Sequence, residues 1–221
     1  MTAKRTAMLA LALLLAAGAA VCGPDGAAQT LPPLEEAKGE MAVEQAIAAR
    51  RSVRRFKTEN LAPAQVGRLV WAAQGITHER RGYRASPSAG ALYPMELYVV
   101  SENGVHKYLP ADHALRPHKA GDVRAQLARA ALGQQFIAQA PITLAIAAVY
   151  ERTTRRYGER GRMYVHMEAG HIGQNVHLQA VALGLGSVPV GAFSDEEVSQ
   201  VLSLPDGEVP LYLITVGHPA E

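Results

Sequence analysis

The sequence contains a single cysteine, Cys22, among 221 residues. One thiol excludes an internal disulfide and a metal cluster held by several thiolates. Net charge is also small, since 22 basic and 20 acidic residues leave a formal charge of +2. We expect no nucleic-acid partner, because such binding depends on neutralising many phosphates. The composition, 48% hydrophobic and 19% charged, excludes disordered, collagen-like and coiled-coil chains and indicates a globular protein with a core.

Several common functional patterns are also missing. No Gly-x-Ser-x-Gly turn is present to carry a hydrolase nucleophile. The glycine-rich residues 184–193 leave a helix and enter a strand, the reverse of the order in a dinucleotide-binding site. His166, His171 and His177 lie on one predicted helix about 140° and 240° apart, so they cannot share a metal ion. We therefore expect no metal site, and histidines that are solvent-facing or hydrogen-bonded.

The chain also lacks an apolar run long enough to span a bilayer as a helix. Residues 7–21 are apolar, which falls short of the roughly 20 residues required. Lys4 and Arg5 precede this run and small residues follow it, so residues 1–28 are interpreted as an export signal. Cys22 also lies where a bacterial lipoprotein carries its lipid, and simple cleavage and lipidation remain alternatives. We expect an exported protein of the bacterial periplasm or cell envelope, anchored to a membrane only if Cys22 is lipidated.

Residues 29–39 are expected to form a linker, and residues 40–219 a single domain. The strongest periodic segment, residues 163–183, predicts a long helix with one apolar stripe. The mixture of helices and four or five strands does not alternate regularly, which indicates an α+β fold. Helices are expected at residues 40–51, 63–74, 122–139, 163–183 and from 194, and strands at 95–100, 106–109, 142–150, 187–193 and 209–216.

Arginines are concentrated where the first helix ends. Arg50, Arg51, Ser52, Arg54 and Arg55 place four guanidinium groups and a hydroxyl within six residues. Charge-assisted hydrogen bonds from such groups suit a doubly charged phosphate. If the segment is extended, Ser52 and Arg54 point the same way and can meet one anion together with Arg50. The alternative is a solvated basic helix end.

Two further segments have small residues that let a ligand approach the backbone. Residues 86–94, with Pro87 and Ser88, predict a rigid loop suited to a flat ligand, although an ordinary loop has a similar composition. Gly184 and Gly186 are expected to end the long helix. Beyond them, Gly191 and Ala192 can expose backbone N–H groups to a ligand.

Taken together, these motifs resemble the nitroreductase family of FMN-dependent oxidoreductases, and within it the thiazoline and oxazoline dehydrogenases of peptide natural-product biosynthesis. The resemblance rests on residues 50–56, 86–98 and 168–193, in that order. It implies a mixed or antiparallel central sheet flanked by helices, and a homodimer with a long core helix. It also implies two FMN molecules held between the subunits.

The resemblance also implies roles for individual residues. Arg50, Arg51, Ser52 and Arg54 match the segment that binds the FMN phosphate and the pyrimidine side of the ring. Residues 87–88, Pro87 and Ser88, match the loop against the flavin. Residues 191–192, Gly191 and Ala192, match the strand end whose N–H reaches flavin N5 from the partner subunit.

The chain departs from the azoline dehydrogenases at the Lys-Tyr pair implicated in proton removal. The matching residues are Arg156 and Tyr157, and an arginine is never a base at ordinary pH. Tyr157 is the candidate catalytic residue, as an acid or hydrogen-bond donor. The leading hypothesis is an FMN oxidoreductase that passes two electrons between a reduced donor, such as NADH or NADPH, and a small organic substrate. The alternatives are azoline oxidation on a peptide and flavin binding without turnover.

Overall fold

The computed structural model describes residues 26–34 and 41–220. Its centre is a seven-stranded sheet with the order β1, β6, β5, β4, β7, β9, β8, in which neighbouring strands are antiparallel. A separate hairpin consists of β2 and β3. The strands are β1 (Gln29–Thr30), β2 (Ile76–His78), β3 (Tyr83–Arg84), β4 (Met95–Ser101), β5 (Gly104–Leu109), β6 (Ala114–Ala120), β7 (Ile142–Ala148), β8 (Gly186–Val190) and β9 (Val209–Gly217).

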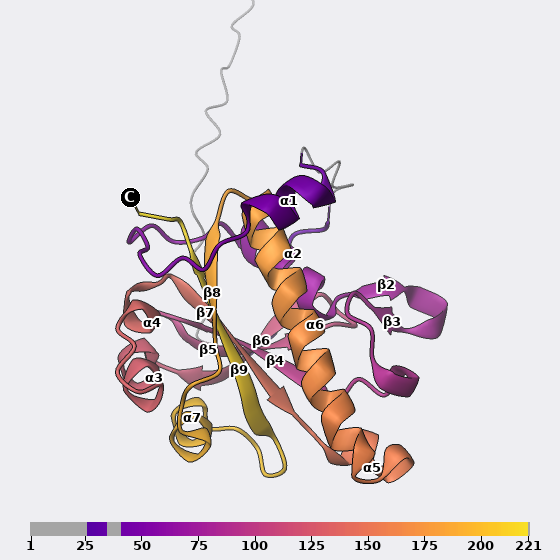
Figure 1. Ribbon diagram of the computed structural model, residues 1–221. Coiled ribbons are helices and arrows are strands. Elements are labelled where there is room, and N and C mark those ends of the chain that lie inside the picture. Colours follow the sequence, from indigo (N-terminus) through magenta and orange to yellow (C-terminus); the bar gives the residue numbers. More distant parts are fainter. Residues whose placement is uncertain (1–25, 35–40, 221) are drawn as a thin grey trace, which may run out of the picture.

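Helices cover both faces of this sheet (Figure 1). On one face α2 packs against the long α6, with α1 at the end of α6, and on the other face α3 contacts α4 and α7. The predicted α+β fold is therefore confirmed. The helices are α1 (Val43–Ala49), α2 (Pro63–Gln74), α3 (Arg124–Ala130), α4 (Phe136–Gln139), α5 (Glu151–Tyr157), α6 (Arg160–Ala182) and α7 (Asp195–Leu202), with 3-10 turns η1 (Glu79–Arg81) and η2 (Ala89–Ala91).

Successive side chains of β4 enter two different hydrophobic cores. Leu97 and Val99 pack with α2 and α6, whereas Tyr98 and Val100 pack with α3, α4 and α7. Side chains alternate between the faces of a sheet, so a strand covered on both faces must be apolar at nearly every position. This arrangement explains the almost uninterrupted apolar sequence of β4.

The long helix α6 has the apolar stripe that its sequence predicts. Val165, Ile172, Val176 and Ala180 are each fully buried. Its end is a Schellman motif, in which the amide of Leu185 donates to the carbonyl of Ala180 at 2.8 Å. Gly184 provides the left-handed residue, with φ +69°, so its predicted role is confirmed.

Gly186 does not end the helix, contrary to the prediction. It is the first residue of β8, and a Cβ atom there would lie 2.8 Å from the Cβ and Cγ1 of Val53. The glycine is required because the arginine-rich segment runs alongside the strand at this point, with Val53 packed against Gly186. A helix-stop glycine and a close-contact glycine have the same local sequence, which explains the error.

The predicted helix at residues 122–139 is two helices. α3 ends before Leu132 and Gly133, which have φ values of +57° and +77°, and α4 begins at Phe136. Left-handed conformations cannot continue an α-helix. Asp122 nevertheless accepts a hydrogen bond from the amide of Arg124 at the start of α3.

β6 was not predicted, because Pro117 lies within it and proline disfavours an internal strand. β1 pairs only with Ala114 and Leu115, so the edge of β6 at Pro117 is free of strand hydrogen bonds on that side. β1 itself corrects the start of the predicted linker, since Gln29–Thr30 is part of the sheet and Leu31 is buried.

The remaining predictions concern the N-terminal part of the chain. The first helix, predicted at residues 40–51, is shorter and spans Val43–Ala49. The remainder of the predicted linker, residues 35–39, and most of the export signal, with Cys22, lie outside the described residues.

Replacing Gly186 should test the close contact with Val53. Gly186→Ala is expected to lower the free energy of unfolding by about 1 to 3 kcal/mol, because a β-branched side chain near the backbone cannot move far enough to admit a methyl group. Gly191→Ala is the matched control, since its Cβ would meet nothing closer than 3.8 Å, and its effect should stay within about 0.5 kcal/mol. Urea unfolding measures both, and equal stability of the two variants would contradict the packing argument.

Candidate functional site

The arginine-rich segment is extended and pairs with the edge of the sheet. Ser52 forms a parallel bridge with Ser187 of β8, and Phe56 an antiparallel bridge with Pro219. The amide of Val53 donates to the carbonyl of Ser187 at 3.0 Å. The expected alternation follows, with Val53 turned toward Gly186 and its sequence neighbours turned away from it.

Three polar side chains of this segment are available to a ligand. Within residues 26–34 and 41–220, Arg50, Ser52 and Arg54 make no ion pair or side-chain hydrogen bond; the guanidinium of Arg54 lies 6.0 Å from the Phe136 ring centre. Arg51 differs from them, because its Nη1 donates at 2.8 Å to the carbonyls of Ala48 and Arg50. The segment therefore presents positive charge without a neighbouring carboxylate to neutralise it.

The other predicted strand end, Gly191 and Ala192, follows β8 directly and is exposed. In the described part of the chain neither backbone N–H has a hydrogen-bond partner. The carbonyl of Ala192 accepts a hydrogen bond from Gln134 Nε2 at 3.0 Å, which helps to hold this segment in place. These N–H groups can therefore donate to a ligand.

The loop of residues 86–94 is held by contacts within itself and with α6. The Ser88 hydroxyl accepts a hydrogen bond from the amide of Tyr93 at 2.9 Å. Asn175 Nδ2 donates to the Ser86 hydroxyl at 3.0 Å, and His171 Nδ1 lies 3.3 Å from the Pro87 carbonyl oxygen. These contacts support the predicted rigidity.

Tyr157 lies against the same loop. A Cβ atom at Gly90 would be 2.8 Å from the Tyr157 hydroxyl and 3.0 Å from Arg156 Nη1. Gly90 has a φ of +61°, so both its conformation and the space around it favour glycine. The structure thus brings the candidate catalytic residue next to the predicted ligand loop, although α5 and the loop are far apart in sequence.

The two groups of predicted residues lie on different sides of α6. His177 hydrogen-bonds to Ser187 beside the arginine-rich segment, at 2.7 Å, whereas His171 contacts the loop at Pro87. Six helical residues separate these positions by about 240° around the axis. The arginine-rich segment and the loop with Tyr157 therefore face different directions in one protomer.

Sequence analysis assigned no role to Glu168, which the structure places on the buried face of α6 behind Ser88. Glu168 is only 2% exposed, and its Oε1 and the Nε2 of Gln74 have no hydrogen-bond partner among the described residues. Burial raises the pKa of Glu168 to about 7, and the nearby Ser88 hydroxyl and the charge of Arg84 limit the rise. A carboxylate inside the apolar stripe of the predicted helix was the signal that could have identified it.

A second buried group on α6, His177, shifts in the opposite direction. Burial, with a smaller contribution from the charge of Arg50, lowers the pKa of His177 to about 4. The raised pKa of Glu168 stabilises the fold at low pH, and this stability is lost as the pH rises through about 7. The lowered pKa of His177 stabilises the fold above its ordinary pKa, and this stability is lost as the pH falls toward 4.

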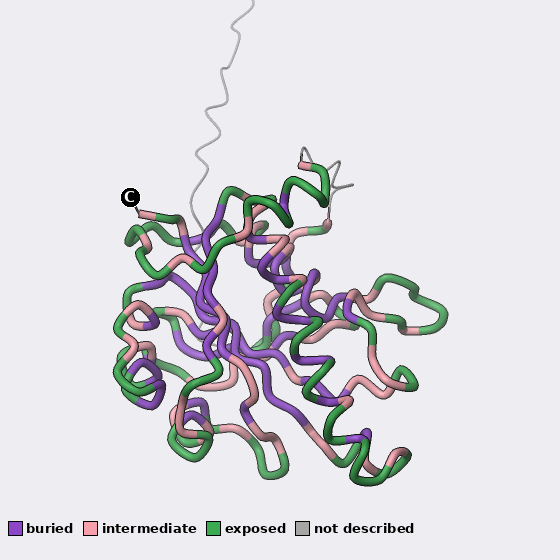
Figure 2. The backbone as a smooth tube through the Cα atoms, in the orientation of Figure 1, coloured by how far each residue is buried: buried purple, intermediate pink, exposed green. Residues whose placement is uncertain are grey.

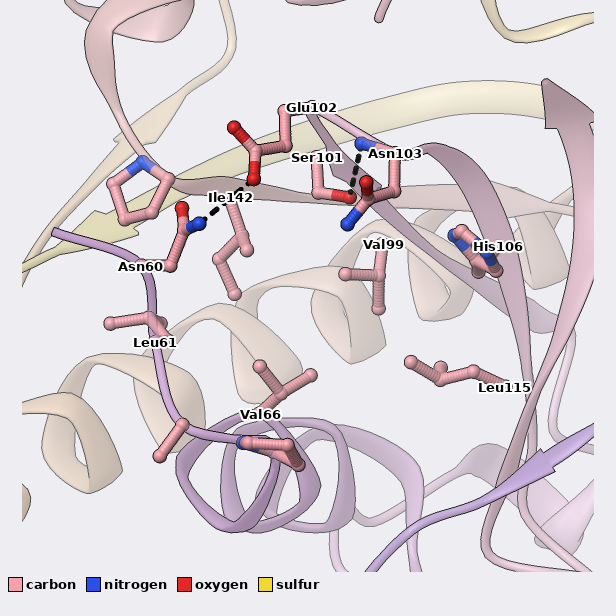
Figure 3. A pocket seen from close by; sticks show the side chains of 13 residues that line it. Asn60, Leu61, Val66, Val99, Ser101, Glu102, Asn103, His106, Leu115 and Ile142 are labelled. Atoms are coloured by element: carbon pink, nitrogen blue, oxygen red, sulfur yellow. Dashed lines mark hydrogen bonds between the residues drawn. The ribbon is translucent and has the colours of Figure 1, made fainter. Parts of the chain in front are cut away.

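A further cavity lies elsewhere in the described part of the chain. It has a volume of about 510 Å³ and lies between the start of α2 and strands β4, β5 and β7. Figure 3 shows apolar side chains such as Leu61 and Val66 along it, and a hydrogen bond of 2.8 Å from Asn60 to Glu102 at its rim. None of the predicted site residues lines it.

Two further observations concern only the residues that the structure describes, 26–34 and 41–220. No helix among them has the length and apolar character to cross a membrane. The same part of the chain has no group of three His, Cys, Asp or Glu side chains placed to hold a metal ion.

The opposed shifts of Glu168 and His177 predict a pH dependence. In the wild type the two effects should nearly cancel between pH 5 and 8. From pH 5 to pH 8 the free energy of unfolding of Glu168→Gln should rise by about 2 kcal/mol, because the His177 effect is no longer opposed. That of His177→Gln should fall by a similar amount, because the Glu168 effect is no longer opposed. Urea unfolding at both pH values measures the changes, and a Glu168→Gln profile parallel to that of the wild type would show that the carboxyl titrates normally.

Comparison with known proteins agrees with these observations. The nitroreductase family model matches residues 47–218. A Methanocaldococcus jannaschii protein named as a nitroreductase is 48% identical over 197 residues, which cover 86% of this chain and 96% of that protein. A crystal structure of a Ralstonia eutropha protein described as a nitroreductase has a TM-score of 0.82 and 27% identity, covering 90% of this chain and 93% of the other.

A more distant relative bears on the branch of the family. The Escherichia coli microcin B17-processing protein McbC is 29% identical over 133 residues, which cover 55% of this chain and 48% of McbC. This similarity supports the branch of peptide natural-product biosynthesis that the motifs indicate. Because the family model matches most of its length, the chain belongs to the nitroreductase family.

Proposed function

We propose that this member of the nitroreductase family is an FMN-dependent oxidoreductase acting on a small organic substrate. The donor, such as NADH or NADPH, gives up a hydride, and the substrate takes up two electrons with protons. FMN supplies the chemistry by accepting and releasing the hydride at N5. The observation that carries the proposal is the set of uncommitted donors at Arg50, Ser52 and Arg54, held in register on β8.

The chemistry of the described residues fits FMN. Two guanidiniums and a hydroxyl without a nearby carboxylate suit the phosphate dianion. Arg54 is the candidate to stabilise negative charge on the pyrimidine side of the reduced ring. The N–H groups of Gly191 and Ala192 can donate to the ring, and Pro87 and Ser88 can lie against it.

We propose that the complete site requires a homodimer. The arginine-rich segment and the loop with Tyr157 lie on different sides of α6, so a second copy can bring the two groups to one ligand. Apolar side chains are exposed on the outer faces of two helices, which Figure 2 colours largely green. They are Val43 and Ile47 on α1 and Met163 and Met167 on α6.

Azoline oxidation on a peptide is the second candidate, favoured by the similarity to McbC. It needs a group that removes a proton, and Arg156 cannot serve as a base. Tyr157 can donate a hydrogen bond or a proton to a substrate lying on the loop. We therefore favour two-electron reduction of a small substrate over ring aromatisation, and active turnover over passive flavin binding.

We further propose that the protein is exported, on the basis of residues 1–28. Mass spectrometry of the mature N-terminus distinguishes cleavage from lipidation at Cys22. A lipid-modified Cys22 would give membrane attachment, whereas cleavage beyond it would give a protein free in the periplasm or envelope.

The colour of the purified protein tests the cofactor. Protein made with ample riboflavin should be yellow and bleach under anaerobic conditions on addition of NADH or NADPH. Bleaching distinguishes the enzyme from a passive flavin-binding protein. Colourless protein that takes up no FMN at micromolar concentration contradicts the proposal.

Arg50→Ala combined with Ser52→Ala should abolish retention of FMN. Loss of a charge-assisted hydrogen bond and a hydroxyl contact is expected to weaken FMN binding about a hundredfold. Flavin absorbance per polypeptide measures this, and circular dichroism checks that the variant is folded. Arg55→Ala is the control; unchanged flavin content in the double variant would refute the phosphate assignment.

Tyr157→Phe should slow substrate turnover at least about tenfold while flavin content remains near that of the wild type, because only the hydroxyl is removed. Tyr83→Phe is the matched control, since it removes the hydroxyl of an exposed tyrosine in β3, outside the candidate site. Turnover kinetics and flavin absorbance measured on the same preparations separate the two effects. Full activity of Tyr157→Phe removes this residue from the catalytic assignment.

A further inference from the structure

Positive charge is concentrated around the turn between α5 and α6. Residues 150–164 contain five arginines and two glutamates, a net charge of +3, whereas the whole chain has +2. Arg152 pairs with Glu96, and Arg155 pairs with Glu151. The other three arginines are Arg156, Arg160 and Arg162.

These three arginines have no carboxylate or other hydrogen-bond partner in the described part of the chain. Each guanidinium lies over a tyrosine ring instead. Arg156 is 5.4 Å from the Tyr157 ring centre, and Arg160 is 5.7 Å from that of Tyr164. Arg162 is 4.6 Å from the ring centre of Tyr150.

A cation–π contact orients a guanidinium without occupying its N–H donors. Because the rings of Tyr157 and Tyr164 pack edge to face, Arg156 and Arg160 belong to one continuous group. We name Arg156, Tyr157, Arg160 and Tyr164 the arginine–tyrosine cluster. It offers ordered, exposed donors in a region of positive charge, which suits a carboxylate or a phosphate.

The position of the cluster relates it to the reaction. Arg156 Nη1 and the Tyr157 hydroxyl approach Gly90, in the loop that we propose lies against the flavin. An anionic group held by Arg156 and Arg160 would keep the rest of its molecule beside that loop.

We propose that the arginine–tyrosine cluster binds the anionic group, a carboxylate or a phosphate, of the molecule that exchanges electrons with the flavin. This inference rests on the proposed function and narrows its substrate class to anionic compounds. The anion can belong to the acceptor, as a carboxylate, or to the donor, as the additional phosphate that distinguishes NADPH from NADH.

Binding of two matched probes tests the proposal on the purified full chain. 4-Nitrobenzoate carries a carboxylate, and 4-nitrobenzamide replaces it with a neutral amide of similar shape. Isothermal titration calorimetry of the wild type should show about tenfold tighter binding of the carboxylate. In Arg156→Gln combined with Arg160→Gln, the ratio of the two affinities should fall to about one.

Arg155→Gln is the control for charge on α5, because it removes one positive charge next to Arg156 in sequence, from an arginine paired with Glu151. It should keep the preference for the carboxylate, and Arg156→Lys combined with Arg160→Lys should retain part of it. The proposal is overturned if the wild type binds both probes equally or if the double glutamine variant keeps the preference. Equal loss in Arg155→Gln also overturns it, by showing a diffuse charge effect.

Two kinetic measurements identify the source of the anion. One compares the rates of flavin reduction by NADPH and NADH, and the other compares the turnover rates of the two nitro compounds. Loss of a preference for NADPH in the double glutamine variant assigns the cluster to the donor, and loss of a preference for 4-nitrobenzoate turnover assigns it to the acceptor. Flavin absorbance separates the two proposals. A colourless protein that prefers 4-nitrobenzoate refutes the cofactor but not the anion site, and a yellow protein without that preference refutes the anion site alone.

Discussion

The pairing of Ser52 with Ser187 determines where the guanidinium groups of the candidate site lie. One backbone hydrogen bond, from Val53 to Ser187, sets the register of an extended segment on the edge of the sheet. Alternation then turns Val53 toward Gly186 and leaves the polar side chains available. A shift of one residue would turn Arg54 inward, where an unpaired charge is costly. The need for glycine at position 186 and the exposure of the charged groups therefore both follow from the register of this pairing.

The helix α6 connects this segment to the rest of the site. His177 joins the helix to β8, and Asn175 and His171 hold the loop that carries Ser88. Glu168 lies behind the same loop, buried and with one oxygen unpartnered. Polar groups on the buried face of a helix, such as Glu168 and His177, are costly unless they are paired. Their concentration on α6 indicates that the helix positions the site as well as forming the core.

The parts of the fold that were predicted correctly depend on local signals. The stripe of α6, the apolar sequence of β4 and the terminal glycine Gly184 can each be recognised within a few residues. The parts that were missed depend on contacts between segments that are distant in sequence. Pro117 is tolerated in β6 because β1 pairs with only two residues of that strand, and Gly186 is required because Val53 packs against it.

The sequence by itself determined the chemistry that is available: clustered guanidiniums, a small-residue loop, strand-end amides and an Arg-Tyr pair that contains no base. Tertiary structure alone decided that Arg156 and Tyr157 meet Gly90 and that Glu168 is buried. The physical reason is that residue type sets which bonds a group can form. Desolvation and proximity, in contrast, arise only when segments distant in sequence are packed together.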